Sequence, residues 1–305
     1  MKRFSLILTL LVTVACGKQA DNVADDDNGS LPEQEIMSLE LPAIPEAIST
    51  MEGKAGYLAG HFWDNLNFTD TLRSLNVDFM EQNFVDFLSL LPAVMSSDRA
   101  VAFDRMLKQA SASHDAYWLM VDMGDKYLMD PNSPLRNEDY YIDFLNSVLG
   151  DTVISPVERE RYEYFLREAN KVRPGSPAPD FKYVTRAGKK SSLRQTLGKP
   201  LVLVFTAPQC DNCKGIIDFV SAHPSVAGPL ESGEIQVLAI YPETDRNAWN
   251  KPLHKLPAAW IDAIVTQEGV DSLYPIPAYP AIYLINPNGT IRLKDATPEV
   301  LIEAL

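Results

Sequence analysis

The sequence predicts an α/β domain at residues 173–305, a central mixed sheet flanked by helices, preceded by an all-α domain at residues 39–172. The first observation behind this prediction is an unbroken apolar run from Leu201 to Phe205, which is typical of a strand buried on both faces. The second is that apolar side chains between Leu39 and Asn170 recur at the spacing of one helix face. The third is a segment rich in proline and glycine, residues 173–179, that separates the two patterns.

The length and charge of the chain limit its function classes. Its 305 residues leave room for about two domains, and 46% hydrophobic residues is ordinary for a folded protein. Acidic residues outnumber basic ones 41 to 27, which gives a net charge of −14. Because nucleic-acid-binding faces are basic, and the chain has no basic run, we expect no nucleic-acid partner.

The amino terminus has the pattern of an export signal. Lys2 and Arg3 supply the positive start, and the apolar stretch from Phe4 to Val14 is too short to span a bilayer, which takes about 20 residues. The sequence Thr-Val-Ala-Cys-Gly at residues 13–17 resembles a bacterial lipobox, although Thr13 stands where leucine is usual. This resemblance implies that residues 1–15 are a lipoprotein signal peptide and that Cys16 carries the lipid, palmitate included. The alternatives are an ordinary signal peptide and an uncleaved anchor.

An acidic stretch follows the predicted lipidation site. Residues 16–38 hold four aspartates and little apolar material, which predicts a flexible tether. The residue after the cysteine is Gly17 rather than the aspartate that commonly retains lipoproteins at the inner membrane. We therefore expect a lipid-anchored protein of the cell envelope, with the outer membrane favoured and its periplasmic or outer face left open.

Within the residues up to 170 we expect five helices and a sixth, less clearly marked, near residues 51–63. The best-marked start is Ser155-Pro156-Val157-Glu158, in which Ser155 caps the helix, Pro156 occupies its first turn and Glu158 reaches back as a capping box. The aromatic stripes of these helices are typical of a core. His61 and His114 have no partner at ligand spacing, and we expect structural or surface roles for them. A spacer, a dimerisation surface and a substrate-docking surface all remain open as the role of this half.

Two cysteines spaced C-x-x-C, Cys210 and Cys213, follow the apolar run and open a predicted helix. The unpaired N–H groups and the dipole at a helix start favour a thiolate at Cys210. Cys213, one turn further in, can then attack a mixed disulfide formed by Cys210. The pattern predicts a redox-active disulfide, with Cys210 as the nucleophile and Cys213 as the resolving cysteine.

The remaining cysteine usage supports this interpretation. The chain has three cysteines, and lipidation would consume Cys16, which leaves an isolated pair in an exported protein. A zinc site is not expected, because the histidines do not stand at the sequence spacing of zinc ligands. Lys214 rather than histidine follows the second cysteine of the pair, which disfavours covalent haem. We expect no metal and no cofactor.

Residues 175–181, Gly-Ser-Pro-Ala-Pro-Asp-Phe, resemble the G-x-x-A-P-D-F start of TlpA/ResA-like thiol–disulfide oxidoreductases and of peroxiredoxins. The resemblance covers about residues 174–305 and implies a thioredoxin-like fold for the predicted α/β domain. The helical half resembles, less specifically, a domain of unknown function that precedes thioredoxin-like domains in some bacterial lipoproteins. Beyond Leu201 to Phe205, the expected elements are strands at 182–185, 235–240, 260–264, 281–285 and 290–294, a helical turn at 245–251 and a last helix capped by Thr297.

Tyr279-Pro280, directly before the apolar run from Ala281 to Ile285, resembles the cis-proline strand of thioredoxin-like proteins. The resemblance implies a cis bond at Pro280 that places backbone beside the disulfide and leaves the polar groups of Tyr279 for a substrate strand. Pro277 is the alternative. We expect Tyr279 and Gln209 to contact the substrate.

The site departs from thioredoxin, which has Trp-Cys-Gly-Pro-Cys. Gln209 replaces the tryptophan, and Asp211 should oppose the lowering of the Cys210 pKa, an effect that Lys214 partly offsets. The buried acid of thioredoxin, six residues before the first cysteine, falls on Val204. Asp262, Glu243 and water are then the alternatives as proton acceptor for the second thiol.

These features predict a membrane-anchored thiol–disulfide oxidoreductase, more a reductant than an oxidant on family grounds. Its partners would be protein disulfide substrates and an upstream dithiol donor. A non-enzymatic, lipid-anchored binding or scaffold protein with a structural disulfide is the alternative from another class. A thiol peroxidase is a third interpretation. The spacing of Thr206 argues against it, because Thr206 lies four residues before Cys210, whereas the threonine of peroxiredoxins lies three residues before the reactive cysteine.

Overall fold

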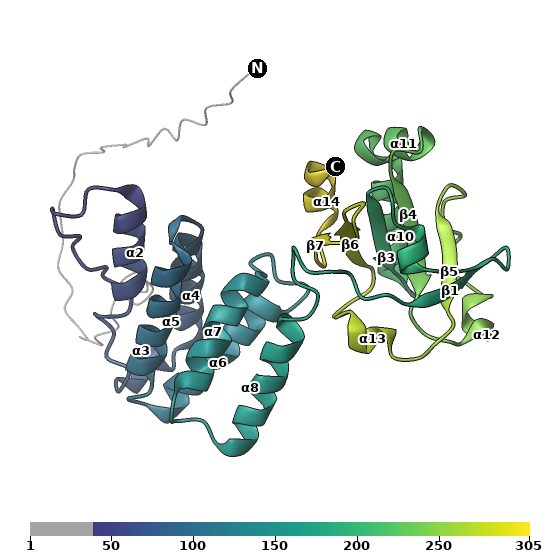
Figure 1. Cartoon of the computed structure of the whole chain (residues 1–305). Helices are drawn as coiled ribbons and strands as arrows, with labels where there is room; N and C mark the ends of the chain where they lie inside the picture. The colour runs from purple at the N-terminus through teal and green to yellow at the C-terminus, as the bar shows by residue number, and fades with distance from the viewer. Residues whose placement is uncertain (1–38) are drawn as a thin grey trace, which may run out of the picture. The chain divides into compact units, whose positions relative to one another are not determined.

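A computed structural model describes residues 39–305 (Figure 1). The predicted signal peptide, the lipidation site Cys16 and the tether lie outside the described residues. No helix in residues 39–305 is long and apolar enough to cross a membrane.

Helices make up the first half of the described chain, as predicted. Met51–His61 confirms the less clearly marked helix, and the capping box at Ser155 and Glu158 is formed in both directions. The short helix Thr71–Ser74 was not predicted, because four residues carry no periodicity. The helices are α2 (Met51–His61), α3 (Thr71–Ser74), α4 (Val77–Leu90), α5 (Ser96–Ala110), α6 (His114–Gly124), α7 (Glu138–Gly150) and α8 (Pro156–Ala169), with a 3₁₀ turn at Leu91–Ala93 and a π turn at Asp125–Met129.

A continuous series of aromatic rings forms the core of these helices. Phe87 packs edge-on against Phe103 with ring centroids 5.6 Å apart, and Phe103 packs in the same way against Phe144. All three side chains are fully buried. The aromatic stripes are therefore core, as the spacing indicated.

A seven-stranded mixed sheet forms the second half, in the order β2-β1-β5-β4-β3-β6-β7 (Figure 1). The inner strand β3 is parallel to β4 and antiparallel to β6, and its five residues are all buried, as the unbroken apolar run predicted. The strands are β1 (Lys182–Thr185), β2 (Lys190–Ser192), β3 (Leu201–Phe205), β4 (Gln236–Tyr241), β5 (Ile261–Val265), β6 (Ala281–Ile285) and β7 (Ile291–Leu293).

Helices cover both faces of this sheet. Buried side chains of α10, α11 and α14 pack on the face that carries Val202 and Val204, and those of α9 and α13 pack on the opposite face with Leu203 and Phe205. The sequence did not predict α11, because Gly228 and Pro229 in its interior are unfavourable in a helix. The helices are α9 (Leu193–Thr196), α10 (Asp211–Ala222), α11 (Pro224–Glu231), α12 (Arg246–Trp249), α13 (Val270–Leu273) and α14 (Pro298–Ala304).

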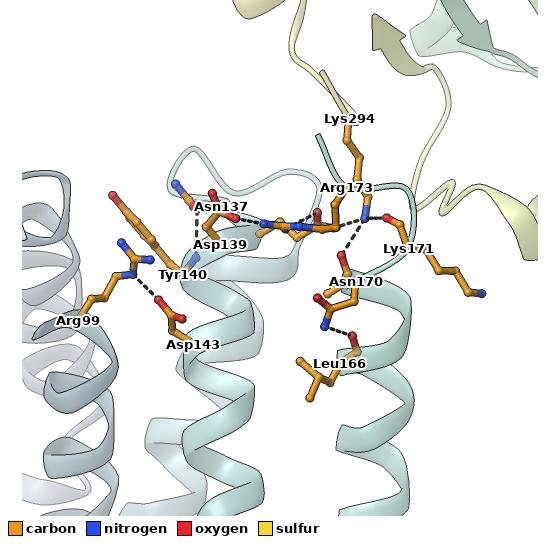
Figure 2. A network of polar contacts seen from close by, with 12 residues as sticks. Arg99, Asn137, Asp139, Tyr140, Asp143, Leu166, Asn170, Lys171, Arg173 and Lys294 are labelled. Atoms are coloured by element: carbon orange, nitrogen blue, oxygen red, sulfur yellow. Dashed lines mark hydrogen bonds and ion pairs between the residues drawn. The ribbon is translucent and has the colours of Figure 1, made fainter. Parts of the chain in front are cut away.

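A polar network involves the segment after β7 and the ends of α7 and α8 (Figure 2). The ammonium group of Lys294 lies 2.7 Å from a carboxylate oxygen of Glu138 and donates to the carbonyl oxygens of Ala169 and Lys171. Arg173 donates to the same Glu138 carboxylate. The side chain of Lys294 is only 4% exposed, so these three acceptors replace the water that a buried ammonium needs. Burial lowers the pKa of Lys294, against the opposing charge of Glu138.

Candidate active site

Cys210 and Cys213 form a disulfide at the start of α10, with an S–S distance of 2.05 Å and Cα atoms 5.4 Å apart. Cys210 occupies the N-cap position, and its sulfur accepts a hydrogen bond of 3.1 Å from the backbone N–H of Cys213. The same N–H would stabilise a thiolate once the disulfide is reduced, together with the helix dipole. The local structure thus places Cys210 where the sequence predicted it.

The two sulfurs differ in access. Cys210 is partly exposed, whereas Cys213 is fully buried against Val204 and the apolar side of α10. A substrate disulfide can therefore reach Cys210 before it can reach Cys213. This difference matches the roles of attacking and resolving cysteine, because a resolving thiol needs to reach only its neighbour.

The backbone before β6 borders the exposed sulfur. The peptide bond between Tyr279 and Pro280 is cis, and the carbonyl oxygen of Tyr279 lies 3.7 Å from the sulfur of Cys210. A disulfide sulfur carries no hydrogen, so in the oxidised protein the two atoms are only in contact. In the reduced protein the Cys210 thiol can donate a hydrogen bond to this carbonyl oxygen. Burial, followed by the charges of Glu243 and Asp271, raises the pKa of the Tyr279 phenol.

The position of the thioredoxin acid is apolar in this protein. Val204 is 1% exposed and packs on the Cys213 side of the sheet. It pairs with Ala239 of β4, which pairs with Asp262 of β5, so the three side chains share one face and one row. Neighbouring strands lie about 4.8 Å apart, so the Asp262 backbone is roughly 10 Å from that of Val204.

The two carboxylates considered as proton acceptors have other partners. Asp262 accepts from Arg186 and, at 3.0 Å, from the indole N–H of Trp249. Glu243 accepts from the Tyr241 hydroxyl at 2.9 Å. Neither makes a direct hydrogen bond to Cys213 among the described residues, so proton exchange at that thiol would need an intervening group such as water.

The residues around the cysteines differ from expectation at Lys214. Asp211 is exposed next to the Cys210 N-cap, as the sequence indicated. Lys214, however, pairs with Asp218 at 2.5 Å, the i,i+4 position of the same helix. Because this pair points along the exposed side of α10, Lys214 offsets the Asp211 charge less than the sequence suggested.

Gln209 is exposed beside the disulfide, and its side-chain amide donates to the carbonyl of Lys251 at 2.8 Å. The backbone N–H of Leu253 donates to the carbonyl of Pro208 at 2.9 Å. Residues 250–256, called here the strap, are thus fastened to the loop before Cys210. The sequence did not reveal the strap, and the helical turn predicted for residues 245–251 overlaps its first two residues.

The two histidines of the helical half lie outside this site, as expected. His61 and Arg105 both contact Asp64, and His114 is exposed. Burial opposes but does not outweigh the hydrogen bonds from His61, Arg105 and Gln109, which lower the pKa of Asp64. This cluster is explained by ion pairing on the surface of the helices.

Comparison with known proteins identifies the family. A thioredoxin-like protein from Bacteroides caccae, solved by crystallography, is 32% identical to this chain. The similarity covers 88% of this chain and 97% of that protein, with a TM-score of 0.80. The chain belongs to the thioredoxin-like proteins.

Two family models match different parts of this thioredoxin-like protein. A domain of unknown function, DUF5106, matches residues 15–172, and the AhpC/TSA family matches residues 174–294. The thioredoxin-like protein YneN of Bacillus subtilis is 23% identical over 139 residues, which cover 43% of this chain and 76% of YneN. A putative thiol:disulfide interchange protein DsbE from Chlorobium tepidum is 22% identical over 44% of this chain and 95% of that protein, with a TM-score of 0.38.

Proposed function

We propose that this protein is a membrane-anchored thiol–disulfide oxidoreductase that acts on exported proteins, working as a reductant. The observation that carries the proposal is the asymmetric cysteine pair, with Cys210 accessible at the start of α10 and Cys213 buried behind it. Membership of the thioredoxin-like proteins supports it. No cofactor is needed, because the two thiols supply both electrons.

The reaction follows from the positions of the two sulfurs. The Cys210 thiolate attacks one sulfur of the substrate disulfide, which forms a mixed disulfide and releases the other substrate sulfur as a thiolate that takes up a proton. Cys213 then loses its proton and attacks the Cys210 sulfur, which releases the second substrate thiol. The protein is left with its disulfide oxidised, and an upstream dithiol donor returns two electrons and two protons to it.

We assign substrate positioning to the groups that border the Cys210 sulfur. The carbonyl of Tyr279 and the adjoining Pro280 flank it on one side. Gln209 precedes Cys210 in the chain and is exposed, and its side-chain amide donates to the carbonyl of Lys251 in the strap. A substrate strand would lie across these groups with its disulfide over Cys210.

A pair of cysteine variants tests the assignment of roles. Cys213→Ser should accumulate mixed disulfides with substrate proteins, because the resolving thiol is gone, and Cys210→Ser should not. Nonreducing gels followed by mass spectrometry measure this. Equal trapping by both variants would contradict the roles, and insulin reduction in dithiothreitol at the background rate would favour a structural disulfide in a binding or scaffold protein.

We also propose that the protein is anchored in the cell envelope through lipid on Cys16, with the outer membrane favoured. The lipobox-like residues 13–17 and Gly17 after the cysteine support this. Metabolic labelling with palmitate should mark the wild-type protein and not Cys16→Ser. Labelling of both proteins would contradict the anchor. Labelling of neither protein, together with absence of the wild type from the membrane fraction, would also contradict it.

A second candidate function is peroxide reduction, which the AhpC/TSA match over residues 174–294 favours. In that reaction the Cys210 thiolate would take one oxygen from the peroxide as a sulfenic acid, and the other oxygen would leave as water or an alcohol. Cys213 would then form the disulfide with release of a second molecule, water. Peroxide consumption by the reduced protein, measured beside insulin reduction, separates the two activities.

A further inference from the structure

A cavity of about 350 Å³ lies beside the loop that leads to Cys210. Thr206, Ala207 and Pro208 of that loop line one side of it, and the strap lines another. Its floor includes Ala239, which sits in the same row as Val204, on the Cys213 face of the sheet. Because the side chain of Ala239 is only a methyl group, the cavity reaches down to the sheet at this position, next to the loop that leads to Cys210.

One hydroxyl group in the cavity wall has no partner. Thr206 is 8% exposed, and its side-chain oxygen makes no hydrogen bond within the described part of the chain. Buried hydroxyl groups are nearly always paired, because an unpaired one keeps its desolvation penalty. The Thr206 hydroxyl is therefore a buried donor without an acceptor, on a residue that lines the cavity.

The charge around the cavity favours an anionic acceptor. Arg186, His254 and Lys255 line it, together with a single carboxylate, Asp262. Both oxygens of Asp262 are engaged, one by Arg186 and the other by the indole of Trp249, so this acid is already neutralised. Lys255 is exposed and forms no ion pair with any described residue. In a chain with a net charge of −14, the cavity is thus locally cationic.

The Arg186 side chain is held in place for such a ligand. Its guanidinium lies over the Trp249 ring, 4.1 Å from the centroid, and donates to the Trp249 carbonyl from one terminal nitrogen. With its Nε on Asp262, the other terminal nitrogen is left for a further acceptor. Fixed donors of this kind bind carboxylates with little ordering cost.

The distance along the chain limits where the carboxylate can come from. Pro208 lines the cavity and lies two residues before Cys210, a span of at most about 7 Å. A substrate strand whose cysteine is at Cys210 has the same reach per residue. A side chain that enters the cavity must therefore belong to a residue about one or two positions from the attacked cysteine.

We propose that this cavity binds the carboxylate of an aspartate or glutamate that flanks the reactive cysteine of the protein substrate. The proposal rests on the thiol–disulfide exchange proposed above and names a substrate feature for it. The hydroxyl of Thr206 and the remaining terminal nitrogen of Arg186 donate to the carboxylate, and Lys255 balances its charge. Substrates with a neutral or basic residue there lack this contact.

The test uses cyclic disulfide peptides of one sequence that carry Glu, Gln or Lys at a single position, one or two residues before or after the attacked cysteine. The rate of exchange with the reduced full-length protein is measured for each. In at least one position, the Glu peptide should react about tenfold faster than the Gln peptide, as a charge-assisted hydrogen bond allows, and the Lys peptide more slowly than both. The preference should shrink at high salt.

Two variants connect the preference to the cavity. Lys255→Gln is an exposed change that keeps the fold, and Thr206→Val keeps the shape of the side chain while removing its hydroxyl. Each should lower the Glu-to-Gln rate ratio at least threefold. Lys190→Gln, at an exposed lysine of β2 that does not line the cavity, is the matched control and should keep the ratio.

The outcomes separate the two proposals. Equal rates for the three peptides at every position, or an unchanged ratio in both cavity variants, overturn the carboxylate site and leave the exchange chemistry standing. Absence of exchange with every peptide, the Gln peptide included, overturns the proposed function and the site with it.

Discussion

The sulfur of Cys210 and the carbonyl oxygen of Tyr279 lie 3.7 Å apart, although the two residues are 69 positions apart in the chain. The contact arises because β3 and β6 are neighbours, with Phe205 opposite Ala281, so the loop after β3 meets the segment before β6. The two halves of the candidate site are thus joined by strand pairing. Substitutions at Asp211, Val204, Gly124 and Lys294 test which contacts maintain this site and the rest of the fold.

The charge of Asp211 should set the reactivity of Cys210. In the reduced protein, Asp211→Asn removes a negative charge next to the thiolate and should lower the pKa of Cys210, because a nearby negative charge disfavours the thiolate. Alkylation by iodoacetamide, followed against pH by mass spectrometry, measures this. Modification should fall on Cys210 and spare the buried Cys213.

Asp218→Asn is the control for this prediction, because Asp218 pairs with Lys214 one turn away from the cap. It should shift the alkylation profile less than Asp211→Asn does. A larger shift from the control, or a higher pKa in Asp211→Asn, would show that Asp211 does not act on the thiolate.

The row of Val204, Ala239 and Asp262 makes a second prediction. Val204→Asp restores an acid at the thioredoxin position but places it at 1% exposure among apolar neighbours. An unpaired buried charge should cost about 3–5 kcal/mol of the free energy of unfolding at pH 7. Urea unfolding measures it, and Val204→Ala, which adds no charge, should cost less. Equal losses would show that the site solvates the carboxylate.

Part of this site could be predicted from sequence because its signals are local. The apolar run from Leu201 to Phe205 and the C-x-x-C after it each lie within one element, where periodicity and spacing are informative. The resemblance to thioredoxin-like proteins implied a cis-proline, and the buried strand that begins directly after Pro280 favoured it over Pro277. Local patterns therefore located both cysteines and the backbone that borders them.

The strap and the unpaired Thr206 hydroxyl could not be predicted in this way. The strap has no hydrophobic period, and its contact with Pro208 joins residues 45 positions apart. Whether a threonine is paired depends on which loop closes over it, which sequence spacing does not report. The ion pair of Lys214 with Asp218 was also not predicted, although the i,i+4 spacing on one helix favours such a pair.

A glycine in the helical core gives a third prediction. A Cβ added at Gly124 would fall onto the ring of Phe144, which is fully buried and packs against Phe103. Gly124→Ala should therefore destabilise the protein by about 1–3 kcal/mol, the usual cost of overpacking, and thermal unfolding measures it.

Gly60→Ala is the matched control for Gly124→Ala. Gly60 is also helical, in α2, and a Cβ there meets nothing within 4 Å. It should raise stability by up to about 1 kcal/mol through helix propensity. A loss at Gly60 equal to that at Gly124 would remove the steric explanation.

The buried ammonium of Lys294 gives the last prediction (Figure 2). Lys294→Met keeps the length of the side chain and removes the donor that serves Glu138 and two backbone carbonyls. Glu138 keeps Arg173, yet the loss of one member of a buried ion pair should still cost about 3–5 kcal/mol. Lys171→Met is the control, because Lys171 pairs with Glu168 at 32% exposure and should cost at most about 1 kcal/mol. Urea unfolding of the two variants side by side measures the difference, and equal costs would show that the Lys294 contacts do not stabilise the fold.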